Sequence, residues 1–296
     1  MSINIVINDT PGILGSYFKA FGSGSRFSEG DTLPHIKINW EGVKFAEGKL
    51  GPYRDVCELD EDGHVPFLYP HSFLGGCHLK MLTHDDFPLK LLGAVHLRNH
   101  LIQYRPLNID QSYDVFLNLC GQRRRPQGLE FDFTTEIKDG DELVWSSLTT
   151  FLVRKKFKEE DGEHPLSQAV TNLEDSKEAA KFEVPANTGK RFGKITGDIN
   201  PIHMSKLLAK LFGFKRDICH GMWALGRGLP LLEGVDLKKP VRLDVAFKGP
   251  LYMQAPIKIL SSSKGDGGFE FYSGKNDRPC VVGSLKNVTE DSKLEG

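Results

Sequence analysis

The sequence lacks several features that would place it in a familiar class. Its five cysteines are far apart and form no C-x-x-C pair, which argues against both a disulfide framework and a zinc site. The formal net charge is −1, so there is no basic excess for a nucleic-acid backbone and no acidic tail. We therefore expect a reducing compartment and no nucleic-acid partner.

Long apolar runs are also missing. No stretch approaches the ~20 apolar residues that a membrane-spanning helix needs, and the N-terminus has no basic region followed by an apolar core. Residues 292–294, Ser-Lys-Leu, would be a peroxisomal signal only at the very end, and Glu295 and Gly296 follow them. These absences predict a cytoplasmic protein with no membrane partner.

The length of 296 residues suits two domains of about 150 residues each. Charges of both signs crowd residues 155–181, which is typical of a solvated linker rather than of a binding tail. We therefore expect an N-terminal domain at residues 1–154, a charged linker at residues 155–181 and a C-terminal domain at residues 182–296.

A faint internal repeat relates the two halves. Residues 101–115 can be laid over residues 245–259 with Pro106 over Pro250, and each segment has the pattern of a strand, a turn and a second strand. Residues 129–133 likewise resemble residues 269–272. The halves are expected to share one order of elements.

Each half also has one apolar helical candidate ahead of its later strands. It lies at residues 221–232 in the second half, with an end or kink near Pro230, and within residues 71–82 in the first. A helix that is apolar all round must be buried, and an antiparallel sheet wrapped around it accomplishes this. The expected class is α+β.

Residues 197–203 form the segment with the clearest chemical potential. Gly197 offers a turn, Asn200 suits a helix cap and Pro201 suits the first helical position, so Asp198 and His203 should lie on one rigid corner. A carboxylate and a neutral imidazole can hold a water between them and move its proton. Helix capping alone explains the same spacing, so the spacing does not distinguish a catalytic pair from a helix cap.

The run from Phe192 to His203, with Ile-Thr-Gly-Asp-Ile-Asn-Pro-Ile-His at its centre, resembles the hydratase motif of the MaoC-like, type 2 (R-specific) enoyl-CoA hydratases. The Ile-Cys-His-Gly-Met of residues 218–222 fits the same pattern, which extends over about thirty residues. The resemblance implies two hotdog domains in tandem, each an antiparallel sheet wrapping a central helix. It also implies that Asp198 and His203 are the catalytic pair.

The resemblance further implies a role for Gly221 as a backbone donor to the thioester oxygen, although close packing explains this glycine as well. Asn200 is expected beside the substrate. Phe192, Gly193 and Lys194 depart from the Tyr-Ala that often precedes the motif, and residues 252–255 replace a frequent Pro-Gly-Asp turn. These departures leave the acyl-chain preference open.

The first half lacks the motif, so we expect one active site per chain. The resemblance to two-domain members of the family implies that the first half holds the acyl chain. Arg124 in an arginine triplet, and Lys248, are candidates for coenzyme A phosphates, with a solvated surface as the alternative for each. His96 and His100 are four apart, but Leu97 stands where a zincin needs Glu, and no third ligand is evident. No metal is expected.

The sequence thus predicts a hydratase/dehydratase that interconverts trans-2-enoyl and (3R)-3-hydroxyacyl thioesters in fatty acid metabolism without a cofactor. The thioester carrier, coenzyme A or an acyl carrier protein, stays open, as does a homodimer. Two alternatives remain: a hotdog acyl-CoA thioesterase, which would release free thiol, and a non-catalytic acyl-thioester binding protein.

Overall fold

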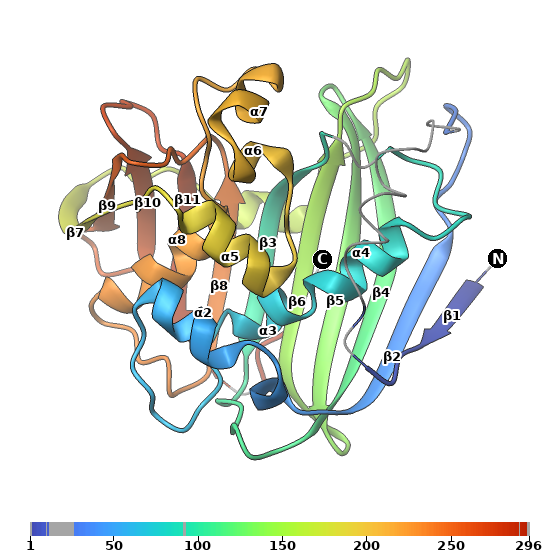
Figure 1. Ribbon diagram of the computed structural model, residues 1–296, viewed down its shortest axis with the longest axis horizontal. Helices are drawn as coiled ribbons and strands as arrows, with labels where there is room; N and C mark the ends of the chain where they lie inside the picture. Colours follow the sequence, from blue (N-terminus) through green and yellow to red (C-terminus); the bar gives the residue numbers. More distant parts are fainter. Residues whose placement is uncertain (1, 10, 12–26, 91–92, 290, 295–296) are drawn as a thin grey trace.

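The computed structural model describes residues 2–9, 11, 27–90, 93–289 and 291–294. The strands of these residues form one sheet of eleven in the order β1-β2-β4-β5-β6-β3-β8-β11-β10-β9-β7 (Figure 1). All pairings are antiparallel except that of β1 with β2. The strands are β1 (Ser2–Val6), β2 (His35–Val43), β3 (Val95–Gln103), β4 (Tyr113–Arg125), β5 (Gly128–Asp139), β6 (Glu142–Val153), β7 (Ser176–Glu183), β8 (Val241–Phe247), β9 (Pro256–Ser262), β10 (Gly268–Ser273) and β11 (Val281–Asn287).

The α-helices lie in front of the sheet in Figure 1. The helices of the described residues are η1 (Phe45–Glu47), α2 (Leu50–Cys57), α3 (Tyr69–Phe73), α4 (Gly75–Leu82), η2 (Pro165–Ala169), α5 (Thr188–Thr196), α6 (Pro201–Met204), α7 (Lys206–Leu211), α8 (Gly221–Gly228) and η3 (Leu229–Leu231). None of the helices in the described ranges is long and apolar enough to span a membrane.

The strand order has the symmetry of a duplication. Reading outward from the central β3–β8 pair, the first half runs β3-β6-β5-β4-β2 and the second runs β8-β11-β10-β9-β7. Corresponding strands therefore occupy corresponding places, and the strand, turn and strand expected around Pro106 and Pro250 are β3–β4 and β8–β9. The expected order of elements and the α+β class are confirmed.

The central helix of each half is also where its apolar sequence predicts. In the second half α8 buries Met222, Trp223 and Leu225, and the buried indole N–H of Trp223 donates to the Val56 carbonyl at 2.8 Å. The helix tightens into η3 before Pro230, as expected for a proline that removes a donor. In the first half the counterpart is divided into α3 and α4.

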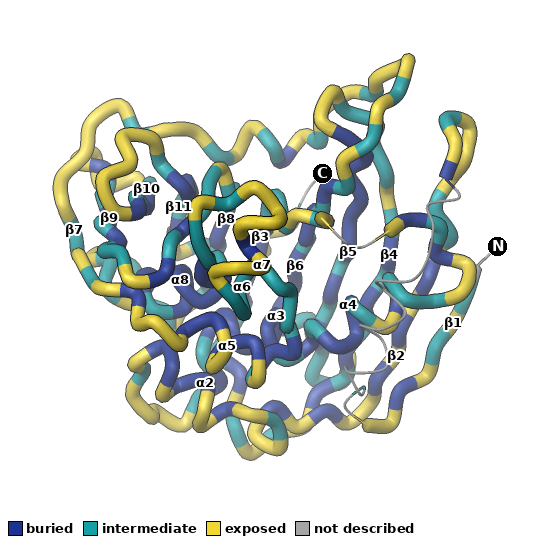
Figure 2. Tube along the Cα trace, turned by 45° about the horizontal axis from the view of Figure 1, so that its top comes forward, coloured by how far each residue is buried: buried dark blue, intermediate teal, exposed yellow. Residues whose placement is uncertain are grey.

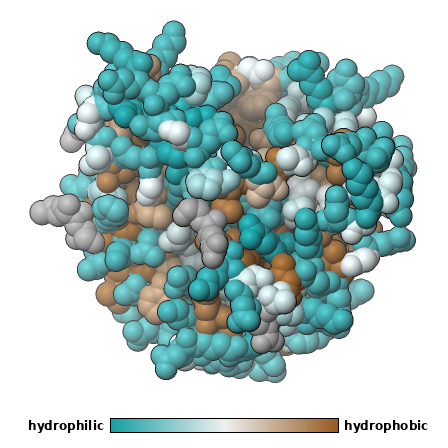
Figure 3. Space-filling model, turned by 180° about the vertical axis from the view of Figure 1, so that it is seen from behind, coloured by the Kyte–Doolittle hydropathy of each residue, from teal (hydrophilic) through white to brown (hydrophobic). Residues whose placement is uncertain are grey.

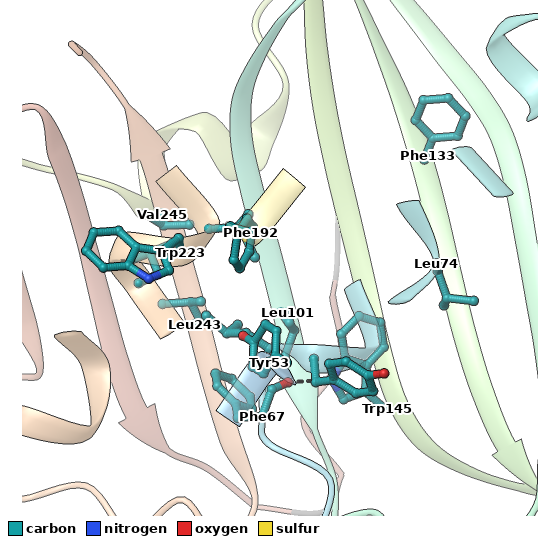
Figure 4. Packing of buried hydrophobic residues seen from close by; sticks show 14 of the residues in the cluster. Tyr53, Phe67, Leu74, Leu101, Phe133, Trp145, Phe192, Trp223, Leu243 and Val245 are labelled. Atoms are coloured by element: carbon teal, nitrogen blue, oxygen red, sulfur yellow. Dashed lines mark hydrogen bonds between the residues drawn. The ribbon is translucent and has the colours of Figure 1, made fainter. Parts of the chain in front are cut away.

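One hydrophobic core extends through both halves. Leu101 of β3 pairs with Leu243 of β8, and both are fully buried, so the apolar surface is continuous across the junction of the two halves. Figure 4 shows Tyr53 and Trp145 of the first half and Phe192 of the second among the packed side chains. The two halves are thus held together by burial as well as by strand pairing.

The charged segment between the halves is anchored at its start and becomes a strand at its end. Arg124 makes two contacts with Asp161, at 2.8 and 3.1 Å, and Arg125 contacts Glu163 at 2.7 Å. The last six residues of the expected linker belong to β7, which starts at Ser176. Alternating charges on an edge strand explain why the sequence pattern reads as a linker.

The sheet face opposite the helices holds polar side chains. His100 contacts Asp244 at 2.8 Å, whereas its neighbour Asn99 faces His71 of α3, so the two side chains point to opposite faces. His96 packs against His71 on the helix side and is therefore separated from His100 by the sheet. Figure 3 shows mostly hydrophilic side chains on the rear of the molecule, with smaller hydrophobic patches between them.

Candidate active site

The corner between α5 and α6 is built by local rules. Gly197 ends α5 with a φ of 80°, a left-handed conformation that favours glycine. The Asn200 side chain accepts a hydrogen bond from the Ile202 N–H at 3.3 Å, and Pro201 begins α6. The turn, cap and first helical position that the sequence predicts are confirmed.

Two glycines of α5 let the corner approach this helix closely. A Cβ at Gly193 would lie 2.7 Å from the Asp198 carbonyl oxygen, and one at Gly189 would lie 2.2 Å from the His203 carbonyl oxygen. The glycines are four apart and therefore share one helix face. Their four-residue spacing is the feature of the sequence from which this contact could have been predicted.

Asp198 and His203 face each other across a gap. Asp198 Oδ2 lies 3.8 Å from His203 Nε2, too far for a direct hydrogen bond. The Nδ1–H of His203 donates to the Ile218 carbonyl at 2.9 Å, which fixes the tautomer of a neutral ring and leaves Nε2 as an acceptor towards Asp198. The carboxylate side chain is 48% exposed and the imidazole 10% exposed, so solvent reaches the pair from the carboxylate side.

His220 is the third group of the site, and no role for it was predicted from the sequence. Its Nε2–H donates to the Asp198 carbonyl at 3.0 Å, and its ring stacks on His203 with centroids 3.7 Å apart. Burial, and next the neighbouring His203, lower the pKa of His220 to about 3. His220 is therefore neutral near pH 7 and holds the backbone of Asp198 in place.

Gly221 follows His220 at the start of α8. A Cβ here would lie 2.3 Å from the Phe247 ring, so no other residue fits without a shift of that ring. Close packing, which is one of the two explanations predicted from the sequence, thus accounts for this glycine. The same position places the first backbone N–H of an eight-residue helix beside His220, where a donor to an oxyanion is also favourable.

The three side chains also meet a distance criterion for a metal site. Ligand atoms of Asp198, His203 and His220 lie within 4.8 Å of one another. However, His220 Nε2, which lies 3.5 Å from Asp198 Oδ2, donates to the Asp198 carbonyl, so this nitrogen offers no lone pair to a metal as arranged. Zinc sites have three or four protein ligands, so the donor set fits proton transfer better.

The two cationic candidates have other partners. Arg124 binds Asp161 and lowers the pKa of that carboxyl to about 2. Three strands, β5, β6 and β3, lie between its strand β4 and β8 in the sheet. Lys248 donates to the Asn172 side chain at 2.8 Å. The structure does not bring either side chain to the Asp198 corner, and their contact with coenzyme A phosphates stays a prediction.

Comparison with known proteins identifies the second half. Residues 164–259, which include Asp198, His203 and Gly221, match the family described as MaoC like domain. The chain contains a MaoC-like domain. The resemblance drawn from the corner sequence is therefore confirmed.

Two relatives match most of the length of this chain. It is 29% identical over 242 residues to 3-hydroxyacyl-thioester dehydratase X of Mycobacterium tuberculosis, covering 81% of this chain and 84% of the relative. A crystal structure of HtdX from that organism aligns with a TM-score of 0.69 and 26% identity, over 85% of this chain and 100% of the other. A MaoC-like dehydratase from Phytophthora capsici aligns at 0.67 and 16% identity, over 87% and 96%, and shows the shared fold alone. The tandem hotdog architecture is confirmed.

One departure from the family pattern has a visible consequence. Gln254, in the segment that replaces the frequent Pro-Gly-Asp turn, adopts a φ of 52°, which favours glycine. Its backbone N–H donates to Val184 and its side chain accepts from Arg216 at 2.7 Å. These contacts hold the turn in a MaoC-like domain that lacks the usual glycine.

Proposed function

We propose that this protein is a hydratase/dehydratase that interconverts trans-2-enoyl and (3R)-3-hydroxyacyl thioesters. The observation that carries the proposal is the geometry of Asp198 and His203, two groups that can share one water between them. The similarity to 3-hydroxyacyl-thioester dehydratase X across both halves supports the same class of reaction.

The geometry supports the following path for hydration. Nε2 of His203 takes a proton from water while Asp198 orients it, and the water oxygen bonds to C3 of the enoyl group. The C2–C3 π electrons shift to form a C1–C2 double bond while the carbonyl π electrons move onto the thioester oxygen, where the Gly221 N–H donates to the developing charge. The proton held on the imidazole then passes to C2, which restores the neutral ring.

The acyl chain is proposed to extend between the halves. A cavity of about 310 Å³ is lined by Tyr53, Leu68 and Gln103 of the first half and by Leu225 and Leu229 of the second. Leu225 is four residues beyond Gly221, which corresponds to about 6 Å along α8. The expectation that the first half holds part of the acyl chain is consistent with this location and stays a prediction, as do the cytoplasmic location and the homodimer.

The test is an activity assay with enoyl-CoA substrates of short, medium and long chain and with the same acyl groups on an acyl carrier protein. We expect loss of the enoyl absorbance and formation of the (3R)-hydroxyacyl product for part of this series. A thiol reagent included in parallel detects thioester cleavage. Release of free thiol without hydration would favour the thioesterase alternative, and tight binding without turnover would favour the binding-protein alternative.

A further inference from the structure

Helix α7 presents apolar side chains to solvent beside the candidate active site. Leu207 and Leu211 are 70% and 76% exposed, and Leu208 and Phe212 are 38% and 37% exposed. They are four of the six large apolar side chains found exposed in the described residues. Figure 2 shows the exposed backbone of α7 above α6 and α5. Large apolar side chains gathered on a surface mark a contact with something else.

The same region has a strong local charge. Residues 184–216 contain seven lysines and arginines and one carboxylate, in a chain whose net charge is −1. Six of these cations are exposed and belong to none of the ion pairs found in the described part of the chain: Lys190, Arg191, Lys194, Lys206, Lys210 and Lys215. We call Leu207, Leu208, Leu211 and Phe212, together with the six cations that lie near them in the sequence, the basic apolar face.

This face is continuous with the catalytic corner. Helix α5 packs against α6, and α6 packs against α7. Ser205 is both the last cap of α6 and the first cap of α7, so only this residue and Met204 separate His203 from the face. Any macromolecule seated on α7 therefore lies next to the side chains that act on the thioester.

We propose that the basic apolar face docks an acidic carrier protein that delivers the acyl thioester to Asp198 and His203. This inference rests on the proposed function, because the docked carrier is the source of its substrate. Six unpaired cations complement an acidic surface, and Leu207 and Leu211 supply the apolar contact area that such an interface needs at its centre.

Two other occupants fit the face less well. Coenzyme A has phosphates for the lysines but is too small to cover four apolar side chains in addition to entering the corner. An anionic membrane matches a basic apolar helix, but α7 has six residues, whereas interfacial helices bury a long apolar face. A protein surface accounts for the charge, the apolar residues and their location together.

The experiment compares two carriers of one acyl group. Two double variants, Leu207→Ser with Leu211→Ser and Lys206→Glu with Lys210→Glu, are assayed with an enoyl group on an acidic acyl carrier protein and on coenzyme A. We expect kcat/KM for the carrier-bound substrate to fall at least tenfold, chiefly through KM, and that for enoyl-CoA to stay within twofold of wild type. Lys275→Glu, in the exposed turn after β10, is the charge control and should change neither value.

A binding measurement separates failure of this inference from failure of the proposed function. Fluorescence anisotropy of a labelled holo-carrier without an acyl group reports docking whether or not hydration occurs, and we expect binding that weakens with salt and is lost in both double variants. An equal fall in kcat/KM for the carrier-bound substrate and for enoyl-CoA would overturn the inference, and so would unchanged binding of the carrier. So would loss of binding to phosphatidylserine vesicles, or of a dimer in sedimentation, in variants whose carrier kinetics are unchanged.

Discussion

At the scale of single residues, the position of Asp198 depends on a hydrogen bond to its backbone carbonyl. His220 donates to the Asp198 carbonyl at 3.0 Å and packs its ring on His203, so it touches both members of the pair without facing the reacting atoms. We regard it as a positioning residue. A change that removes the donor but keeps the ring volume should loosen Asp198 while the protein stays folded.

We therefore expect His220→Phe to lower kcat about tenfold with little change in KM, since misplacement of a catalytic group has effects of this order or larger. His220→Gln, whose amide N–H can reach the place of Nε2, should recover part of that loss. Steady-state kinetics of both variants make the measurement. Equal kcat values for the two would show that the hydrogen bond to Asp198 is unimportant.

Several residue-scale features follow from the sequence because their causes are local. The turn at Gly197, the cap at Asn200 and the helix start at Pro201 involve neighbours in the chain. The bond from His220 to Asp198 joins residues 22 apart, and that from Arg124 to Asp161 joins residues 37 apart. Residue types alone do not identify such distant partners, which explains why His220 was missed.

At the scale of elements, α5 is the support on which the corner rests. A Cβ at Gly193 would approach the Asp198 carbonyl oxygen to 2.7 Å and the Met204 side chain to 2.8 Å. The Met204 contact involves the end of a flexible side chain, whereas the contact with Asp198 requires a shift of backbone. The effect of filling this space should therefore appear in catalysis more than in stability.

We expect Gly193→Ala to lower kcat/KM at least tenfold, because a displacement of about 1 Å at a catalytic group can cost 10²-fold. Gly51→Ala in α2 is the matched control, since its Cβ would meet nothing within 4 Å. The control should keep full activity and gain about 0.5–1 kcal/mol in the free energy of unfolding, measured by denaturant titration. Full activity in Gly193→Ala would contradict the proposed support.

The elements themselves could be predicted to different degrees. The apolar helix at residues 221–232 and the strands around Pro106 and Pro250 follow from periodicity and turn residues. The pairing of β3 with β8, which joins the two halves into one sheet, has no sequence signal of its own, because strand edges pair through backbone groups common to all residues. The start of β7 was assigned to the linker because its edge position permits a charged sequence.

At the scale of the whole molecule, buried histidines make stability depend on pH. Burial lowers the pKa of His71 to about 4, that of His78 to about 3 and that of His220 to about 3. The unfolded chain binds protons to these residues from about pH 6.5 downward, whereas the folded protein does not. Stability is thus fully present above pH 6.5 and is lost as the pH falls towards 3.

The expected loss between pH 7 and pH 5 is about 1–2 kcal/mol for each of these histidines, as the free energy of unfolding in urea. His78→Phe should flatten this dependence by about the share of one histidine. If the free energy of unfolding were the same at pH 7 and pH 5, these histidines would not be buried in the neutral form, and the account would be contradicted.

The duplicated architecture also explains why one site serves two halves. The corner occurs only in the MaoC-like domain of residues 164–259, while the first half contributes its sheet, its divided helix and part of the cavity at the junction. The faint repeat in the sequence was enough to predict the duplication. The joint core, which depends on tertiary packing across β3 and β8, was not visible in it.

The most direct test of the central claim is the rate of enoyl-thioester hydration by wild type, Asp198→Asn and His203→Ala at one pH. The account predicts measurable turnover by wild type and a loss of at least 10²-fold in each variant, the usual effect of removing a general acid or base. Both variants should keep the wild-type unfolding transition. Near-normal turnover in either variant would contradict the assignment of Asp198 and His203 as the pair that activates water.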